Sequence, residues 1–278
     1  MYAAYFGFRE MPFSILPDPR FLYLSRAHSM ALSMLEYGVH NQAGFTVVTG
    51  AIGSGKTTLI QHLLRSVGQE LHVGLMNHTP RRDDNLFEWL LLVFDQPIEN
   101  RSYAGMYRQF CDFVSGVSES GGRVVLIVDE AQNLEPARLE ELRMLSNLNS
   151  DVMILQLILV GQPELSAILS TPELRQFAQR ISSDFHLPKL MPREVSAYID
   201  HRLRFVNGNP SLIAPRARTL IAEAAEGIPR QVNILVDRCL AYVYGCGGNV
   251  VTARLVREVI DDRSRHGVFR TGPRLALT

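Results

Sequence analysis

The stretch Phe45-Thr-Val-Val-Thr-Gly-Ala-Ile-Gly-Ser-Gly-Lys-Thr-Thr-Leu59 joins an apolar, β-branched run to the start of a helical pattern. Its middle, residues 50–57, matches G-x-x-x-x-G-K-[ST] at every fixed position. Glycines let the backbone of such a turn fold tightly and direct successive N–H groups inward, where they bind phosphate oxygens. The N-terminus of the following helix adds further free N–H groups. This order of strand, loop and helix predicts a phosphate-binding loop.

Two side chains near the end of this loop have distinct predicted roles. Lys56 brings a positive charge to the β- and γ-phosphates of a nucleotide, and the Thr57 hydroxyl is a ligand for Mg²⁺. The alternative is a glycine-rich turn that binds nothing, but strand, loop and helix occur in the order that binding requires. We therefore expect ATP and Mg²⁺ to be bound by nine consecutive residues: Gly50, Ala51, Ile52, Gly53, Ser54, Gly55, Lys56, Thr57 and Thr58.

A second apolar run ends in two carboxylates. Residues 124–128 are all apolar, as in a parallel strand that is buried on both faces, and Asp129 and Glu130 follow directly. Downstream of a complete phosphate-binding loop, this pattern predicts that Asp129 holds Mg²⁺, directly or through a water, and that Glu130 polarises the attacking water. The alternative is a pair of acids that only caps the turn at residues 131–134.

The composition indicates a globular protein without a strong global charge. Lysine plus arginine and aspartate plus glutamate both number 28, so the formal net charge is zero. No run of about 18 apolar residues occurs, the N-terminus lacks a signal-peptide pattern, and the three cysteines lack metal-binding spacing. We expect a cytoplasmic protein with no transmembrane segment of its own, which reaches the inner membrane only peripherally, through a partner.

From residue 201 onward twelve arginines stand against six acidic residues. This excess predicts either an ordinary solvated helical surface or a face for nucleic acid or another partner.

The order of strands and helices predicts an α/β domain followed by a helical one. Five strand patterns alternate with helices up to about residue 190, which indicates a five-stranded parallel sheet flanked by helices. After Pro188 and Pro192 only helical patterns follow. We expect a nucleotide-binding domain at residues 1–190, a helical lid at 191–265 and a tail at 266–278. The aromatic, proline-broken segment 5–24 is expected to be an extended loop that packs its rings, either around a purine or into the core.

Polar residues mark four further positions. Gln162 follows the fourth strand and should lie beside the two carboxylates. Arg175 and Arg180 precede the fifth strand. Arg230, in Gly227-Ile-Pro-Arg, falls in the first turn of a helix, where it either serves the nucleotide or forms a surface ion pair.

Together these motifs resemble those of AAA+ ATPases. The segments Tyr5-Phe-Gly-Phe, Gly161-Gln-Pro-Glu-Leu165 and Gly227-Ile-Pro-Arg-Gln-Val-Asn233 resemble in particular the general secretion pathway protein A (ExeA-like) family, which is close to ATPases of pilus biogenesis and of exosortase-linked clusters. The resemblance implies that Gln162 is the sensor 1 residue, that Arg230 is the sensor 2 residue, and that Arg180 or Arg175 is an arginine finger for a neighbouring subunit.

The family also implies what the protein does. We expect hydrolysis of ATP, in a ring or helical homo-oligomer, to drive or regulate assembly of an envelope, secretion or polysaccharide-export system. Secretion-pathway members usually continue into a transmembrane helix and a peptidoglycan-binding domain, which this sequence lacks, so an envelope role would need a membrane or envelope protein as partner. Target-selecting ATPases of transposition share the core, so an ATP-dependent DNA-binding regulator is the alternative. A nucleotide-dependent scaffold with negligible turnover is a third class.

Overall fold

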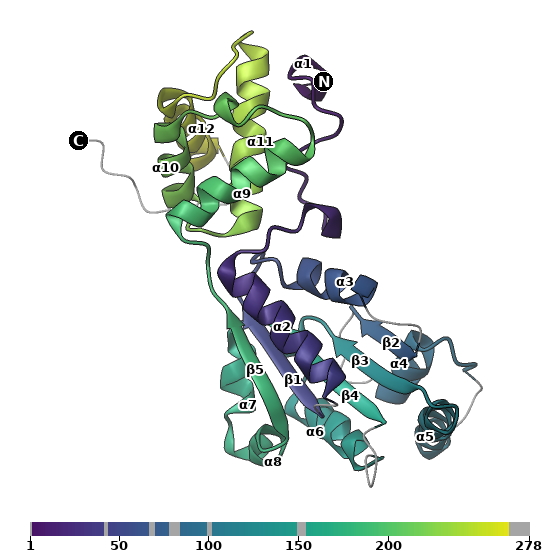
Figure 1. The fold of residues 1–278 in the computed structure, drawn as a ribbon. Helices are drawn as coiled ribbons and strands as arrows, with labels where there is room; N and C mark the ends of the chain where they lie inside the picture. Colours follow the sequence, from purple (N-terminus) through teal and green to yellow (C-terminus); the bar gives the residue numbers. More distant parts are fainter. Residues whose placement is uncertain are drawn as a thin grey trace. The chain divides into compact units, whose positions relative to one another are not determined.

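The computed structural model describes residues 2–41, 44–66, 70–77, 84–98, 102–148 and 154–266. They form two compact units, which Figure 1 draws as a ribbon. Unit A consists of Arg26–Ala51 and Lys56–Leu187, and unit B of Met1–Ser25, Ile52–Gly55 and Pro188–Thr278, as far as these ranges are described. Apart from His266, the expected C-terminal tail lies outside the described residues.

Unit A is built on one parallel sheet of five strands in the order β2-β3-β4-β1-β5 (Figure 1). The predicted five-stranded α/β fold is therefore confirmed. Every residue of β1 and β4 is buried, as the continuous apolar runs in the sequence indicate for parallel strands covered on both faces. The strands are β1 (Phe45–Gly50), β2 (Leu71–Met76), β3 (Arg123–Val128), β4 (Leu155–Gly161) and β5 (Ile181–Leu187).

Helices cover both faces of this sheet. Alternate residues of the central strands, such as Val47, Leu126 and Leu157, belong to one large core together with residues of α4 to α8. Figure 1 shows α2 lying across β1 and β5, and α3 also contacts β1. The helices of unit A are α2 (Arg26–His40), α3 (Lys56–Ser66), α4 (Leu86–Val93), α5 (Tyr103–Glu119), α6 (Pro136–Leu145), α7 (Glu164–Leu169) and α8 (Arg175–Ala178).

Local contacts set where two elements of unit A begin. Helix α4 begins at Leu86, because the Asn85 side chain accepts a hydrogen bond from the Phe87 N–H and caps the helix. Before β5, residues Pro172–Leu174 form a 3₁₀ turn that the short α8 follows, and Ile181 pairs with Phe45 as the first residue of β5. Pairing with β1 therefore sets the start of β5.

Unit B contains a helical core. One buried cluster joins Val195, Ile221, Val236 and Val256, each from a different helix. No helix in the described part of the chain is both long and apolar enough to cross a membrane. The helices of unit B are α1 (Tyr2–Tyr5), α9 (Pro192–Phe205), α10 (Pro215–Ala224), α11 (Pro229–Gly245) and α12 (Ala253–His266).

The aromatic N-terminal segment packs into this helical core. Tyr2, Phe8, Phe13 and Phe21 are buried in the same cluster as the helices of unit B. The structure thus differs from the expected domain division, which assigned residues 1–25 to the nucleotide-binding domain. Their rings bury apolar surface against α9 and α11, so core packing, one of the two expected uses of these rings, is what the structure shows.

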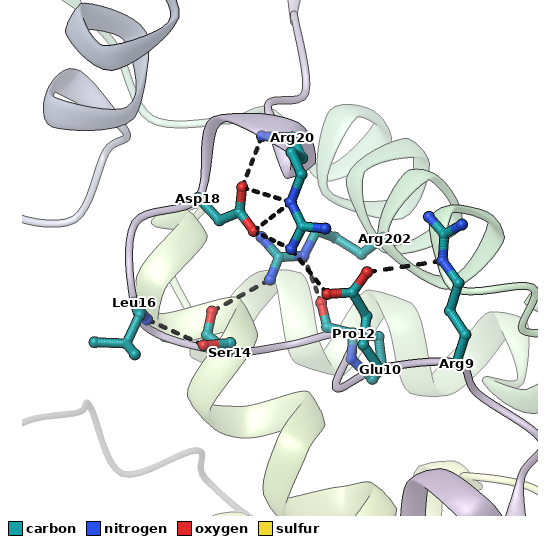
Figure 2. A network of polar contacts seen from close by, with 8 residues as sticks. All are labelled: Arg9, Glu10, Pro12, Ser14, Leu16, Asp18, Arg20 and Arg202. Carbon is teal, nitrogen blue, oxygen red and sulfur yellow. Dashed lines mark hydrogen bonds and ion pairs between the residues drawn. The ribbon is translucent and has the colours of Figure 1, made fainter.

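A buried arginine fastens this segment to α9. Arg202 Nε donates to the Pro12 carbonyl at 2.5 Å and Nη2 to the Ser14 carbonyl at 3.2 Å, as Figure 2 shows. Its guanidinium carbon lies 4.2 Å from the centroid of the Phe21 ring. Nearby, Arg20 bridges Asp18 and Glu10 (Figure 2). Arg202 therefore serves the interior of unit B and is unavailable to an external partner.

The glycine of the Gly227-Ile-Pro-Arg motif has a structural role. Gly227 has a φ of +70°, and its carbonyl accepts a hydrogen bond of 2.8 Å from the Leu190 N–H. A Cβ at this position would lie 2.1 Å from the Leu190 carbonyl oxygen. Only glycine fits both the left-handed conformation and this close approach, so Gly227 connects the start of α11 to the segment that precedes α9.

Candidate functional site

The phosphate-binding loop lies between the end of β1 and the start of α3, as the sequence predicts. Gly53 and Gly55 have φ values of +77° and +104°, in the region that residues other than glycine rarely adopt. The motif glycines therefore allow the loop to turn back on itself. Of the other loop residues, Ser54 is buried, Ile52 is exposed and Thr58, in the first turn of α3, is half-buried.

Lys56 is the first residue of α3 and is buried. Its Nζ donates hydrogen bonds to the Gly50 carbonyl at 2.8 Å and to the Ala51 carbonyl at 3.1 Å. Burial lowers the pKa of Lys56, while the carboxylates of Glu130, Asp129 and Glu164 act in the opposite direction. Its ammonium group is therefore held against the loop by two backbone carbonyls.

Thr57 and Asp129 lie next to each other. The Thr57 Oγ1 donates to Asp129 Oδ2 at 2.8 Å. Asp129 is buried directly after β3, where its Oδ1 accepts the Glu130 N–H at 2.9 Å and its own N–H donates to the Met76 carbonyl. A hydroxyl and a carboxylate are oxygen ligands of the kind that Mg²⁺ prefers, so the two side chains fit the ion that the sequence predicts.

Glu130 has an unusual backbone. Its φ and ψ are +53° and +38°, the left-handed region, which is rare for a residue with a side chain and is found mainly at functional sites and tight turns. Its Oε2 accepts hydrogen bonds from Gln132 Nε2 at 2.7 Å and from Gln162 Nε2 at 3.2 Å. Burial raises the pKa of Glu130, but the hydrogen bonds from Gln132 and Gln162 and the charge of Lys56 together lower it.

Gln162 thus lies beside Glu130, as the order of strands and polar residues predicts. It follows the last residue of β4, and its backbone N–H donates to Gln132 Oε1 at 2.9 Å. Gln132 is not among the site residues that the sequence predicts. The sequence feature that could have identified Gln132 is its place as a polar residue two positions after the acid pair, in the turn that leads away from the strand.

Arg230 is the second residue of α11 and contacts the tip of the phosphate-binding loop within unit B. Its N–H donates to the Gly53 carbonyl at 3.2 Å. A Cβ at Gly53 would lie 2.5 Å from the Cβ of Arg230, so the loop glycine also permits this approach. The structure therefore brings Arg230 to the loop through its backbone and the base of its side chain.

The two candidates for the arginine finger have different surroundings. Arg180 is half-buried, donates to Asn147 Oδ1 at 2.8 Å and to Ser146 Oγ, and lies at the end of the helical turn before β5. Arg175 is exposed at the start of α8. Arg180 therefore has partners within its own chain, and an encounter with a neighbouring subunit would have to break or share these contacts.

Comparison with known proteins connects this site with a family. The AAA domain matches residues 39–169, which include the loop, Asp129, Glu130 and Gln162. The chain is also 36% identical over 284 residues to general secretion pathway protein A of Aeromonas hydrophila, a match that covers 100% of this chain and 52% of that protein. The chain is an AAA+ protein related to general secretion pathway protein A. It spans about half the length of this curated relative.

Solved structures share the fold of this AAA+ protein at low sequence identity. The ORC2 protein of Aeropyrum pernix, solved in ADPNP and ADP complexes, superposes with a TM-score of 0.69 at 18% identity, over 92% of this chain and 72% of the other. Cdc6p of Pyrobaculum aerophilum gives a TM-score of 0.67 at 16% identity, over 89% and 71% of the two chains. These likenesses concern the fold alone.

Proposed function

We propose that this AAA+ protein binds ATP with Mg²⁺ and hydrolyses it to ADP and phosphate. The observation that carries the proposal is the grouping of three pairs at the carboxyl ends of β1, β3 and β4: Lys56 on the loop carbonyls, Thr57 with Asp129, and Glu130 with Gln162. In open parallel sheets this end of the strands is where ligands bind.

Each pair has a proposed task. Lys56 would exchange its loop carbonyls for the β- and γ-phosphate oxygens, and Thr57 and Asp129 would hold Mg²⁺. Bound Mg²⁺ supplies positive charge that offsets the negative charge developing on the phosphoryl oxygens. Glu130 would orient the attacking water and accept its proton, while Gln162 holds the carboxylate in place.

The remaining residues extend the proposal beyond one subunit. An arginine of a neighbouring copy, Arg180 or Arg175, would stabilise the charge of the transferring phosphoryl group. Arg230 would contact the bound nucleotide and so couple nucleotide binding to the helical lid at residues 191–265. The position of Arg230 against Gly53 supports the second role. This arrangement requires a homo-oligomer, ring or helical, in which hydrolysis changes the contacts between subunits.

Two measurements test the hydrolysis. A rise in melting temperature with Mg·ATP tests binding, because a ligand that binds only the folded state stabilises it by mass action. Release of phosphate tests turnover, and Glu130→Gln serves as the inactive comparison. A wild-type protein that shows no thermal shift with Mg·ATP contradicts the proposal at its first step, and one that binds ATP without releasing phosphate is instead a nucleotide-dependent scaffold.

The cellular role is proposed from the relative. General secretion pathway protein A is named for secretion, and we place this chain in assembly or regulation of an envelope, secretion or polysaccharide-export system. Replacement of the gene by the Glu130→Gln form in its own host should abolish that export, with the protein level unchanged. DNA binding in a gel-shift assay would instead favour a DNA-associated regulator of the transposition type, if the binding needs ATP and weakens steeply as the salt concentration rises.

A further inference from the structure

Gln132 joins the reactive carboxylate to the end of a neighbouring strand. Its Nε2 donates to Glu130 Oε2 at 2.7 Å, and its Oε1 accepts the backbone N–H of Gln162 at 2.9 Å. Since the side chain of Gln162 also donates to Glu130 Oε2 at 3.2 Å, the three residues form a closed ring of hydrogen bonds. The side-chain amide of Gln132 thus donates to the side chain of Glu130 and accepts from the backbone just after β4.

This ring leaves the two carboxylate oxygens unequal. Among the described residues, both hydrogen bonds to the Glu130 carboxylate go to Oε2, and Oε1 accepts none. An oxygen that already accepts two hydrogen bonds has little capacity left for a third, so the carboxylate presents Oε1 to a water molecule. The ring of hydrogen bonds therefore determines which carboxylate oxygen of Glu130 is available to a water molecule, and where that oxygen lies.

The local backbone is shaped to permit the ring. Glu130 adopts the left-handed conformation, and the 3₁₀ turn Ala131–Asn133 that follows directs Gln132 toward β4. Gly161, the last residue of β4, has no side chain, and a Cβ there would lie 2.9 Å from Gln132 Oε1 and 2.8 Å from Leu165 Cδ2. A glycine at the end of this strand and a glutamine after the acid pair are therefore complementary features of the sequence.

We propose that Gln132 is a positioning residue, which holds the Glu130 carboxylate in the orientation that activates water and couples it to the end of β4. This inference rests on the proposed hydrolysis of ATP. Gln132 is assigned no contact with the nucleotide, so its loss should affect turnover and leave nucleotide binding unchanged. In metal sites, removal of the partners that orient a ligand commonly lowers affinity or activity by about 10–100-fold, and we expect an effect of this size here.

The test uses Gln132→Ala, Gln132→Glu and a matched control, Gln109→Ala. Gln109 lies on α5 and donates to the Pro97 carbonyl at 2.8 Å, so its variant also removes one side-chain hydrogen bond from unit A. We expect kcat of both Gln132 variants to fall about 10–100-fold, with KM, ADP affinity and the melting temperature of the nucleotide-free protein unchanged. Gln132→Glu keeps the chain length but has no N–H to donate, so it should not restore activity.

A double-mutant cycle separates positioning from a merely structural role. If Gln132 acts through Glu130, adding Gln132→Ala to Glu130→Gln should lower the residual rate less than twofold, because groups that act as one unit are not additive. A full multiplicative loss in the double variant, or a Gln132→Ala enzyme as fast as the Gln109→Ala control, would overturn the inference.

A crystal structure of nucleotide-free Gln132→Ala provides a readout that does not depend on turnover. We expect the Glu130 carboxylate to leave Gln162 Nε2, whereas an unchanged Glu130 would count against positioning. The outcomes also separate the two proposals. A wild-type protein without ATP hydrolysis contradicts the proposed function, and the crystal structures still decide whether Gln132 positions Glu130.

Discussion

Thr57 Oγ1 donates a hydrogen bond of 2.8 Å to Oδ2 of Asp129, although 72 positions separate the two residues in the chain. Thr57 follows β1 and Asp129 follows β3, and β4 lies between these two strands in the sheet. The hydrogen bond satisfies two polar groups in the nucleotide-free protein. Binding of Mg²⁺ by these two side chains would break this hydrogen bond while the Thr57 hydroxyl keeps its proton, so the ion would change the contacts at the end of the phosphate-binding loop.

Loss of Lys56 should abolish tight binding of ATP. In Lys56→Ala the charge that would meet the β- and γ-phosphates is gone, while the Gly50 and Ala51 carbonyls lose only a side-chain donor. Mg·ATP at a hundred times its dissociation constant should stabilise the wild type by about 2.7 kcal/mol, and a thermal-shift titration should show no such rise for the variant. Lys189→Ala is the control, because the only other lysine of the chain forms an exposed ion pair with Glu226.

Loss of the Glu130 carboxylate should separate binding from turnover. Glu130→Gln keeps the shape of the side chain but removes the base, so we expect unchanged ATP affinity and a rate at least about a hundredfold lower. Binding by calorimetry and phosphate release by a coupled assay measure the two effects. Glu119→Gln, at the exposed end of α5, should match the wild type in both assays. A Glu130→Gln protein that hydrolyses at the wild-type rate would move the water-orienting role elsewhere.

Loss of Arg180 should impair hydrolysis in the neighbouring subunit and leave ATP binding unchanged. We expect Arg180→Ala to bind ATP as the wild type does but to hydrolyse it poorly, because an arginine supplied by a neighbour contributes about 10³–10⁵ in rate in other enzymes with this loop. The wild-type rate per subunit should rise with protein concentration, in step with assembly measured by light scattering. Mixing Arg180→Ala with Glu130→Gln should restore some active interfaces.

The activity of Arg180→Ala by itself distinguishes the two arginines. A fully active Arg180→Ala protein would shift the assignment to Arg175, which is exposed on α8. A strictly monomeric wild type, with activity per subunit independent of concentration, would contradict a finger supplied in trans by either residue.

Substitution of Gly227 should destabilise unit B more than substitution of an ordinary left-handed glycine. Gly247 has a φ of +62° with nothing within 4 Å of a Cβ, so Gly247→Ala should cost only the conformational penalty of about 1–2 kcal/mol. In Gly227→Ala the Cβ would also meet the Leu190 carbonyl oxygen. We expect a further loss of about 1–3 kcal/mol, measured by urea denaturation. Equal losses for the two variants would show that the close approach to Leu190 is unimportant.

Removal of the buried arginine should release the N-terminal segment. Arg202→Ala takes a donor from the Pro12 and Ser14 carbonyls. The Ser14 carbonyl keeps its hydrogen bond from Asn233 Nδ2, so the cost of about 1–3 kcal/mol for an unpaired buried acceptor applies to the Pro12 carbonyl. Limited proteolysis should then cut within residues 9–20 before the rest of unit B. Arg204, two positions along α9, is exposed, and Arg204→Ala should change the unfolding free energy by less than about 0.5 kcal/mol. Identical proteolysis of the two variants would argue against a role of Arg202 in holding the N-terminal segment on α9.

Local patterns predicted the parts of the site that follow directly in sequence. The loop at residues 50–57, Lys56 at the start of α3 and the acids after β3 needed only the order of strand, glycine turn and helix. Local patterns do not record pairing between segments that are distant in the sequence. Ile181 begins β5 because β1 offers it hydrogen-bond partners beside Phe45.

By itself the sequence determined the fold class and the chemistry available to it, because continuous apolar runs specify buried parallel strands and the glycine motif specifies a phosphate-binding turn. Tertiary structure decided which groups meet. The strand order β2-β3-β4-β1-β5 brings the ends of β3 and β4 side by side, and only then can Gln132 span from Glu130 to Gln162. The N-terminal rings joined the helices of unit B for a similar reason: burial of apolar surface depends on which faces are left uncovered, and no local pattern records that.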